Sequence, residues 1–362
     1  MISASDRAFL DRTYDLAAHA IGNTSPNPPV GAVVVRDGHV LGEGFHHRAG
    51  GPHAEVNALA QAGDASGATM YVSLEPCDHV GRTPPCTRAL LDAGIARVVV
   101  GALDRSGHGN LDRLRERGVE VVVADDAAAR DLIEIFSFSL ERDRAYVALK
   151  MAMSLDGYVT SRSGVQEWIT GEEGRLYVRD LRIAYDAVMV GAGTVRIDDP
   201  QLTVRPATHR LREFVRIVAC EREPLPPDRR VFLPLPGYAR TIVLAPAGAR
   251  ATFSPLERVA DVAYVGEESA QALDLPAALR LLRERDIQSV LCEGGPTLAG
   301  RLIAQGLVDR LYWAIAPVLL RSDAAVPVLA GADLGGAARA VRFDRMERFG
   351  RDVMISGTLS DV

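Results

Sequence analysis

The sequence has little of what marks membrane-spanning, secreted or nucleic-acid-binding proteins. No uncharged apolar run in its 362 residues approaches the ~20 residues that a bilayer-spanning helix needs. The first twenty residues lack a basic segment followed by an apolar core, so they do not read as a secretory signal. The net charge of −6 leaves no excess of positive charge for a broad contact with nucleic acid. We therefore expect a cytoplasmic protein whose partner is a small molecule, with no nucleic acid and no membrane.

The chain is long enough for two hydrophobic cores. Hydrophobic periodicity and turn residues predict alternating helices and strands in the first half. The expected helices are 6–20, 52–62, 86–93, 111–117 and 125–141, and the expected strands are 30–35, 40–45, 69–76, 96–103 and 119–124. This alternation predicts a mixed three-layer α/β domain. A charged stretch before a new strand at 146–154 predicts a boundary near 142–146, and hence domains 1–144 and 145–362.

Cysteine is scarce, and only two of the four cysteines, Cys77 and Cys86, lie close together. In a large intracellular chain such a pair is more often a metal or catalytic pair than a disulfide. Upstream, His53 and Glu55 form the His-x-Glu pattern that precedes Pro-Cys in zinc deaminases. His53, Cys77 and Cys86 supply an imidazole and two thiolates, which leave the fourth tetrahedral position of Zn²⁺ to water. Because zinc lowers the pKa of that water toward ~7, Glu55 is the candidate to carry its proton to the leaving nitrogen.

Two other interpretations of these residues stay open. The histidine can be a buried structural residue beside two unrelated cysteines. Alternatively, His79 can complete a structural zinc site with four protein ligands. The positions of the ligands favour the catalytic site, because PHAEV opens a helix, LEPC ends a strand and Cys86 opens the next helix.

The strings TSPNPPVGAVVV, GFHHRAGGPHAEV and LEPCDHVGRTPPC closely resemble the bifunctional deaminase/reductase of bacterial riboflavin biosynthesis, and the resemblance covers nearly the whole chain. It implies an N-terminal cytidine-deaminase-like domain that removes an amino group from a phosphoribosylamino-pyrimidine. It also implies a C-terminal dihydrofolate-reductase-like domain that reduces the ribosyl group with NADPH, and a homo-oligomer. The substrate-contacting residues that it implies in the first domain are Asn27, His46, His79, Arg82 and Thr83.

The second half carries strings that match the reductase part of that family. They are YVALKMAMSLDGYVT, EWITG, DAVMVGAGTVRIDDPQLTVR and SVLCEGGPTLAG. Two of them place glycines between a strand and a helix, where backbone N–H groups can approach a phosphate. The resemblance implies cofactor contacts at Ser154, Trp168, Thr170, Gly191, Gly193, Thr194, Asp198, Gly294, Gly295 and Thr297. It implies substrate contacts at Arg182, Leu202, Arg205 and Glu293.

Three residues of this half, Thr170, Lys150 and Asp198, have both a functional and a structural interpretation. Thr170, with Glu173 three residues later, has the pattern of a helix capping box. Lys150 and Asp198 are candidates for the catalytic groups of the reduction, Lys150 by orienting the sugar and Asp198 by holding its hydroxyls or relaying a proton. The alternative is that Lys150 and Asp198 form a structural ion pair across the cleft.

Several positions depart from the family pattern and leave the substrate less determined than the chemistry. The loop 104–110 is shorter than usual, and Gln166 stands where a serine is usual. Cys220-Glu221 replaces an Asp-Ser pair, and Arg321 replaces a glycine.

These departures motivate a second hypothesis, a paralogue that uses both chemistries on a related pyrimidine or pteridine precursor. A nucleic-acid base deaminase and a non-catalytic zinc scaffold are less favoured, because of the reductase strings and Glu55 respectively. The sequence does not decide between NADPH and NADH.

Overall fold

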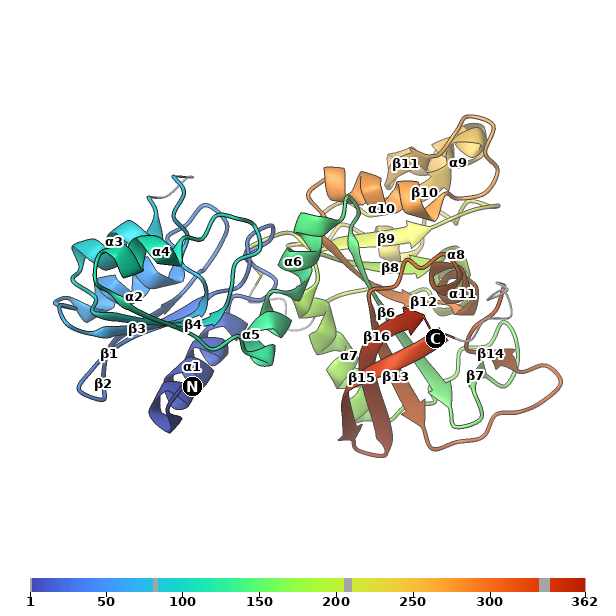
Figure 1. The fold of residues 1–362 in the computed structure, drawn as a ribbon. Coiled ribbons are helices and arrows are strands. Elements are labelled where there is room, and N and C mark those ends of the chain that lie inside the picture. Colours follow the sequence, from blue (N-terminus) through green and yellow to red (C-terminus); the bar gives the residue numbers. More distant parts are fainter. Residues whose placement is uncertain (1, 81–83, 205–209, 332–338, 362) are drawn as a thin grey trace. The chain divides into compact units, whose positions relative to one another are not determined.

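A computed structural model of the chain describes residues 2–80, 84–204, 210–331 and 339–361 (Figure 1). Two compact units divide between Arg142 and Asp143. Within the described residues, no helix is both long and apolar enough to cross a bilayer.

The first unit consists of a five-stranded sheet with helices on both faces (Figure 1). Its strands are β1 (Gly31–Arg36), β2 (His39–Phe45), β3 (Thr69–Leu74), β4 (Arg97–Ala102) and β5 (Glu120–Val123). Its helices are α1 (Ala4–Ala18), α2 (Ala54–Ala62), α3 (Cys86–Asp92), α4 (Leu111–Glu116), α5 (Ala127–Leu132) and α6 (Glu134–Glu141). The strand order is β2-β1-β3-β4-β5, with β1 antiparallel to both neighbours and β3, β4 and β5 parallel.

Alternating side chains of the buried strands build one core on each face of this sheet. On β1, Ala32 and Val34 pack in the core that α2, α3 and α4 cover, while Val33 and Val35 pack in the core that α1 and α5 cover. This period of two follows from the strand geometry. The arrangement confirms the expected three-layer α/β domain.

The expected helix 125–141 is wrong in one respect, because the structure breaks it into α5 and α6. The break lies at Ile133, whose φ of −102° and ψ of 11° leave the helical region. Ile133 is 4 % exposed and belongs to the core under α5, whereas α6 has no fully buried residue. The two helices therefore pack differently, although no glycine or proline marks the break.

The second unit is built on a nine-stranded sheet of order β11-β10-β9-β8-β12-β6-β13-β16-β15, with a small sheet of β7 and β14. Its strands are β6 (Tyr146–Ser154), β7 (Tyr158–Thr160), β8 (Ala187–Gly191), β9 (Val215–Ala219), β10 (Ile242–Pro246), β11 (Asp261–Val265), β12 (Ser289–Gly294), β13 (Arg310–Ala316), β14 (Val326–Pro327), β15 (Arg339–Phe349) and β16 (Asp352–Asp361). Its α-helices are α7 (Glu172–Leu181), α8 (Ala192–Asp198), α9 (Arg250–Phe253), α10 (Leu275–Glu284) and α11 (Pro296–Ala304).

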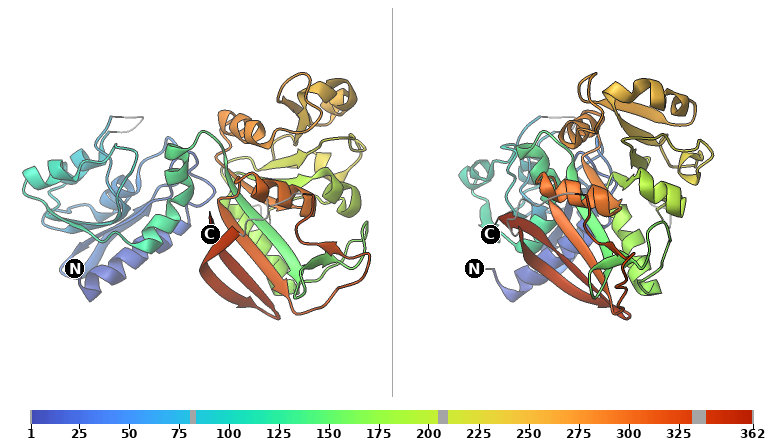
Figure 2. Two further views of the ribbon diagram at one scale, coloured as in Figure 1. Left: turned by 45° about the vertical axis from the view of Figure 1, so that its right-hand side comes forward. Right: turned by 90° about the vertical axis from the view of Figure 1, so that its right-hand side faces the viewer.

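Seven of the nine strands are parallel, from β11 to β13, and β16 and β15 follow as an antiparallel hairpin, red in Figure 2. Helices α10 and α11 cover one face of the parallel part, and α8 with α9 packs on the other. Since ligands of open α/β sheets bind beyond the carboxyl ends of parallel strands, the loops after β8, β9 and β12 are the expected site.

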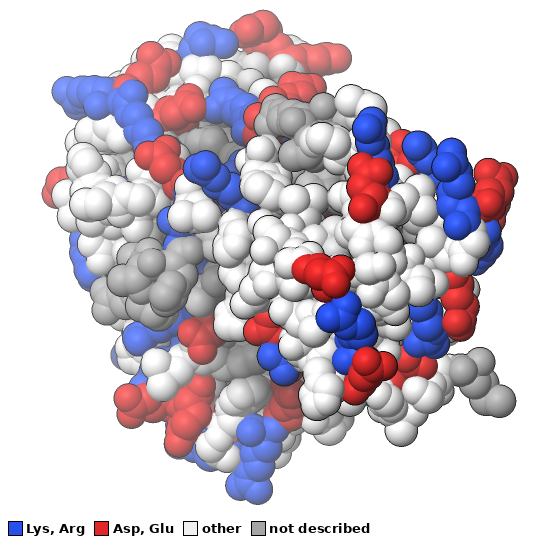
Figure 3. All heavy atoms as spheres, turned by 90° about the vertical axis from the view of Figure 1, so that its left-hand side faces the viewer, with Lys and Arg blue, Asp and Glu red and all other residues white. Residues whose placement is uncertain are grey.

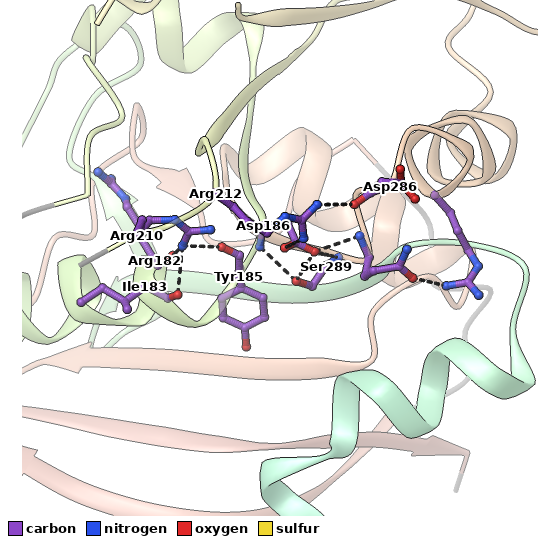
Figure 4. Close-up of polar contacts among 10 residues, drawn as sticks. Arg182, Ile183, Tyr185, Asp186, Arg210, Arg212, Asp286 and Ser289 are labelled. Atoms are coloured by element: carbon purple, nitrogen blue, oxygen red, sulfur yellow. Dashed lines mark hydrogen bonds and ion pairs between the residues drawn. The ribbon is translucent and has the colours of Figure 1, made fainter. Parts of the chain in front are cut away.

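A buried carboxylate, Asp186, joins the beginnings of β8 and β12 (Figure 4). It accepts hydrogen bonds from the backbone N–H groups of Gln288 (2.9 Å) and Ser289 (3.2 Å) and from Arg212 Nη1 (3.0 Å). The Asp186 N–H in turn donates to Ser289 Oγ at 3.1 Å. Asp186 is 6 % exposed, so these partners compensate a charge that burial otherwise makes unfavourable.

The expected capping box at Thr170 is wrong. The structure begins α7 at Glu172 with Gly171 as the N-cap, and no side chain of that segment caps the helix. Asp352 on β16 does so instead, because its Oδ2 accepts the Gly171 N–H at 2.7 Å. The cap comes from 181 residues further along the chain.

Positive and negative side chains are interspersed on the face of the molecule drawn in Figure 3. No extended positive surface is seen among the described residues of that face.

Candidate functional site

The three side chains predicted to bind zinc converge at one end of the first sheet. His53 directly precedes α2, Cys86 opens α3, and Cys77 follows β3 and forms an isolated bridge with Gly109. His53 Nδ1 lies 3.2 Å from Cys86 Sγ and 3.5 Å from Cys77 Sγ, and all three donor atoms lie within 4.8 Å of one another. Tetrahedral zinc with ordinary Zn–N and Zn–S bonds places such atoms about 3.6 Å apart. One imidazole and two thiolates at this spacing fit a zinc ion that keeps an open position.

Glu55 lies in the first turn of α2, two residues after His53, and is 3 % exposed. Burial raises the pKa of this carboxyl, which favours a group that holds a proton between two transfers. The predicted proton carrier therefore lies beside the predicted ligands.

Two further predicted residues form a fixed pair beside the ligands. His46 is 3 % exposed, and its ring lies 5.3 Å from that of His53. Its Nδ1 lies 2.9 Å from the carbonyl of Pro52, which can only accept, so Nδ1 carries the proton and Nε2 accepts from Asn27 Nδ2 at 3.1 Å. Burial lowers the pKa of His46, which favours the neutral ring.

The loop after Cys77 is described only in part. His79 is exposed, and its ring lies against that of His108 at a tilt of 31°, with centroids 4.1 Å apart. Among the described residues, His79 does not join the group of converging ligand atoms, so the four-ligand structural site is not formed. Arg82 and Thr83, expected to contact the substrate, lie outside the described residues.

The second unit has two neighbouring cavities, of about 790 and 530 Å³. The glycine turns after β8 and β12 line the larger one, and α7 lines the smaller one. The charged residues Lys150, Asp198 and Glu293 are among those that line both cavities, so they lie where the two cavities adjoin.

The two glycine turns lie against each other because β8 and β12 are adjacent parallel strands. Thr194 Oγ1 donates to the carbonyl of Gly294 at 3.2 Å. Gly295 has a φ of +108°, which favours glycine, and a Cβ there would also approach Thr194 Oγ1 to a tight 3.1 Å. The turns provide the close backbone approach that a diphosphate needs.

Charge at the junction of the cavities is balanced by a buried pair. Arg182 donates from Nη2 to Glu293 Oε2 at 2.8 Å, from Nε to Oε1 at 2.5 Å, and from Nη1 to the carbonyl of Thr203 at 2.6 Å. Burial works to raise the pKa of Glu293, but Arg182 and then Lys150 outweigh it and hold that pKa below its usual value. Burial also lowers the pKa of Lys150.

Asp198 ends α8 and is half-buried. Burial alone raises its pKa, and the charges that act on Lys150 belong to Glu293, Arg182 and Asp352. Within the described part of the chain the structure shows no Lys150–Asp198 ion pair. The structural alternative for these two residues is therefore not supported.

Most of the other predicted reductase residues line one of the two cavities, and a few line neither. The larger cavity is lined by Gly191, Gly193, Thr194, Gly295 and Thr297, and the smaller one by Trp168, Thr170, Arg182 and Leu202. Gly294 lines neither cavity, and neither does Ser154, which is fully buried and donates to Asp156 Oδ1 at 2.5 Å. Arg205 lies outside the described residues.

Several lining residues were not predicted from the sequence. Arg175 and Arg179 on α7 line the smaller cavity with Arg182. Their spacing of four and three residues is that of one helix face, and this stripe is the signal that could have found them. In the larger cavity, Arg301 forms an ion pair with Glu221.

The positions that depart from the family pattern fall in different places. Gln166 lines both cavities and Glu221 the larger one. The backbone N–H of Arg321 donates to Asp156 Oδ2 at 2.9 Å, away from the cavities. The loop 104–110 packs on the cysteine segment of the first unit.

Comparison with known proteins covers both units. Residues 145–355 match the model of the RibD C-terminal domain, and residues 3–102 match the cytidine and deoxycytidylate deaminase zinc-binding region. The riboflavin biosynthesis protein RibD of Aquifex aeolicus is 37 % identical over 98 % of this chain and 99 % of its own length. The chain belongs to the RibD family. The RibD protein of Escherichia coli is 38 % identical, over 97 % of this chain and 98 % of its own length.

Solved RibD structures agree with the fold. A Thermotoga maritima structure, titled as a diaminohydroxyphosphoribosylaminopyrimidine deaminase and 5-amino-6-(5-phosphoribosylamino)uracil reductase, is 34 % identical with a TM-score of 0.85, over 98 % of this chain and 99 % of that one. Acinetobacter baumannii RibD is 31 % identical with a TM-score of 0.83, over 99 % of both chains. The expected RibD fold, a cytidine-deaminase-like domain followed by a dihydrofolate-reductase-like domain, is confirmed.

Proposed function

We propose that this chain performs two consecutive steps of riboflavin biosynthesis. The first is the hydrolytic deamination of 2,5-diamino-6-(5-phosphoribosylamino)pyrimidin-4-one, and the second is the NADPH-dependent reduction of the ribosyl group to a ribityl chain. The observation that carries the proposal is that one chain holds a His/Cys/Cys ligand group with a buried glutamate and, in its other unit, a two-part cleft beside two glycine turns. The relative from Thermotoga maritima is titled with both activities.

In the deaminase unit, His53, Cys77 and Cys86 are the residues that hold zinc. A zinc ion with an open position acts as a Lewis acid toward water. Glu55 would take one proton from the attacking water, whose oxygen bonds to the ring carbon, and would pass that proton to the amino group, which leaves as ammonia when the C–N bond breaks. Asn27 and His46, fixed by their mutual hydrogen bond, orient the pyrimidine beside Glu55.

In the reductase unit, NADPH is the hydride donor. The turns at Gly191–Thr194 and Gly295–Thr297, whose N–H groups suit an anion, would hold its diphosphate. The phosphorylated sugar occupies the smaller cavity, where the arginines of α7 suit its phosphate. Lys150 orients the sugar, and Asp198 relays a proton or holds the hydroxyls where the cavities meet.

The paralogue hypothesis rests on the departures in sequence. Similarity to RibD proteins extends over nearly the full length of this chain, which favours the riboflavin pathway. Gln166 and Glu221 remain the lining residues at which a change of substrate or cofactor preference would originate.

Localisation and assembly remain predictions. All four cysteines are free, which is compatible with a reducing cytoplasm. A homo-oligomer follows only from the family resemblance.

The metal assignment is tested by zinc analysis of the purified chain and of a Cys77→Ala/Cys86→Ala double variant. We expect one zinc per chain in the wild type and none in the variant. The variant should lose deamination but still reduce a substrate that has already been deaminated. Zinc retained by the double variant, or a wild type that deaminates without zinc, would refute the assignment.

A further inference from the structure

The carboxylate of Asp78, the residue after the ligand Cys77, has three side-chain partners. Arg113 Nη1 donates to Asp78 Oδ1 at 2.8 Å, and Asn110 Nδ2 donates to Oδ2 at 3.2 Å. The hydroxyl of Thr87 donates to Oδ1 as well. Only 13 % of the Asp78 side chain is exposed, so this carboxylate is nearly enclosed by its partners.

These partners connect both cysteine ligands. Thr87 follows Cys86 directly and is fully buried, and its N–H donates to the carbonyl of Cys77 at 3.1 Å. Asp78 follows the predicted ligand Cys77, and Thr87 follows the predicted ligand Cys86. The hydrogen bond between Asp78 and Thr87 therefore connects the positions next to the two cysteines. It joins the two ends of the intervening segment directly.

The same carboxylate anchors both ligands to a third part of the unit. Asn110 is the N-cap of α4, and Arg113 lies in its first turn. The N–H of Asp78 donates to the carbonyl of His108 at 2.7 Å, and Cys77 pairs with Gly109. The shortened loop 104–110 is thus the surface on which the cysteine segment is held.

We propose that Asp78 is a positioning residue that holds Cys77 and Cys86 at the separation that zinc requires. This inference rests on the metal site proposed above. Two thiolates repel each other until a cation binds, so a fixed connection between their segments reduces the rearrangement that binding needs. Hydrogen bonds to a carboxylate are shorter and stronger than neutral ones, which suits this role. Arg113 balances the negative charge that Asp78 adds near the thiolates.

A charge effect and a positioning effect are separated by the choice of variants. Asp78→Asn keeps the shape but removes the charge, and it loses at least one of the three hydrogen bonds because the amide nitrogen cannot accept. Thr87→Val removes the side-chain hydrogen bond between Asp78 and the residue after Cys86 without a change of charge. Asp112→Asn, on the same helix, is the matched control, because Asp112 is 80 % exposed and its ion pair is with Arg115.

Two quantities are measured for each purified full-length protein. They are the zinc dissociation constant, by competition with a chromophoric chelator, and the melting temperature with and without zinc. Changes in residues that support metal ligands typically cost 10–100-fold in metal affinity, so we expect a loss of about that size for Asp78→Asn and about tenfold for Thr87→Val. Asp112→Asn keeps wild-type affinity. The rise in melting temperature on zinc binding shrinks in the first two variants only.

A merely structural role gives a different pattern. Melting temperatures of the metal-free and zinc-bound forms then fall together, and zinc affinity does not change. A folded Asp78→Asn protein with wild-type zinc affinity would overturn the proposal and leave the metal assignment intact. If Asp78→Asn does not fold, Thr87→Val decides in the same way. A wild type without zinc would overturn the metal assignment and this inference with it.

Discussion

Replacement of Asp198 by asparagine separates a catalytic role from a structural one. Asp198 lines both cavities of the reductase unit and ends α8, and its carboxyl is half-buried. Burial raises its pKa, and the structure records no hydrogen bond or ion pair to this side chain among the described residues. Asparagine has nearly the same shape, so the substitution removes charge and proton transfer and leaves the packing unchanged.

The expected effect on stability follows from the direction of the pKa shift. A carboxyl whose pKa in the folded state lies above its unfolded value of ~3.9 binds more protons when folded, so the stability it contributes falls as the pH rises through that range. At pH 7 the charged form is therefore a cost, which asparagine does not have. We expect the free energy of unfolding to stay within ~0.5 kcal/mol of wild type or to rise. Reductase kcat/KM should fall by the ~10²–10⁴-fold typical of lost acid–base catalysis.

Asp186→Asn is the matched control in the same unit. Asp186 accepts hydrogen bonds from Arg212 and from two backbone N–H groups, so its replacement should cost at least the ~1.5–3 kcal/mol of one hydrogen bond to a charged group. Thermal melting and NADPH oxidation at saturating cofactor give both quantities for each variant. A stable Asp198→Asn protein with full turnover, or one whose activity only follows its folded fraction, would refute the catalytic assignment.

Three further predictions concern Glu55, Arg179 and Asp6. Glu55→Gln should lower ammonia release ~10²–10⁴-fold with zinc content and reduction of pre-deaminated substrate unchanged; wild-type ammonia release would show that another group carries the proton. Arg179→Gln should raise KM for the phosphorylated substrate about tenfold, the effect of losing ~1.4 kcal/mol, with kcat unchanged; an unchanged KM would remove α7 from the phosphate site. Arg97 holds the pKa of Asp6 well below its usual range, so this pair stabilises the first unit above ~pH 4 and the contribution is lost as the pH falls. Melting of Asp6→Asn between pH 7 and 3 should show a lower melting temperature at neutral pH and a weaker pH dependence, and an equal pH dependence in both proteins would contradict this.

The features that were predicted correctly from the sequence depend on local signals. His53, Glu55, Cys77 and Cys86 sit in short strings whose strand and helix context is visible from neighbouring residues, and the structure brings the three ligands together. The alternation of helices and strands in the first half predicted a three-layer domain, and the structure confirms it. The family resemblance, rather than residue spacing, supplied the roles of the cleft residues.

The parts that it did not predict depend on contacts between distant segments. Gly171 is capped by Asp352, 181 residues away, so a local capping pattern at Thr170 was misleading. Asp78 meets Arg113 35 residues later, and nothing in the string around Cys77 indicates that partner. The break at Ile133 follows from packing, since the apolar pattern of 125–141 is continuous.

The central claim is that one chain performs a zinc-dependent deamination followed by a reduction. The most direct measurement incubates the zinc-loaded protein with the diaminopyrimidine ribotide, with and without NADPH, and identifies the products by mass. We predict the deaminated ribosylamino compound and ammonia without NADPH, and with NADPH a product that has gained one hydride and one proton. Unchanged substrate under both conditions, or reduction without deamination, would contradict the account.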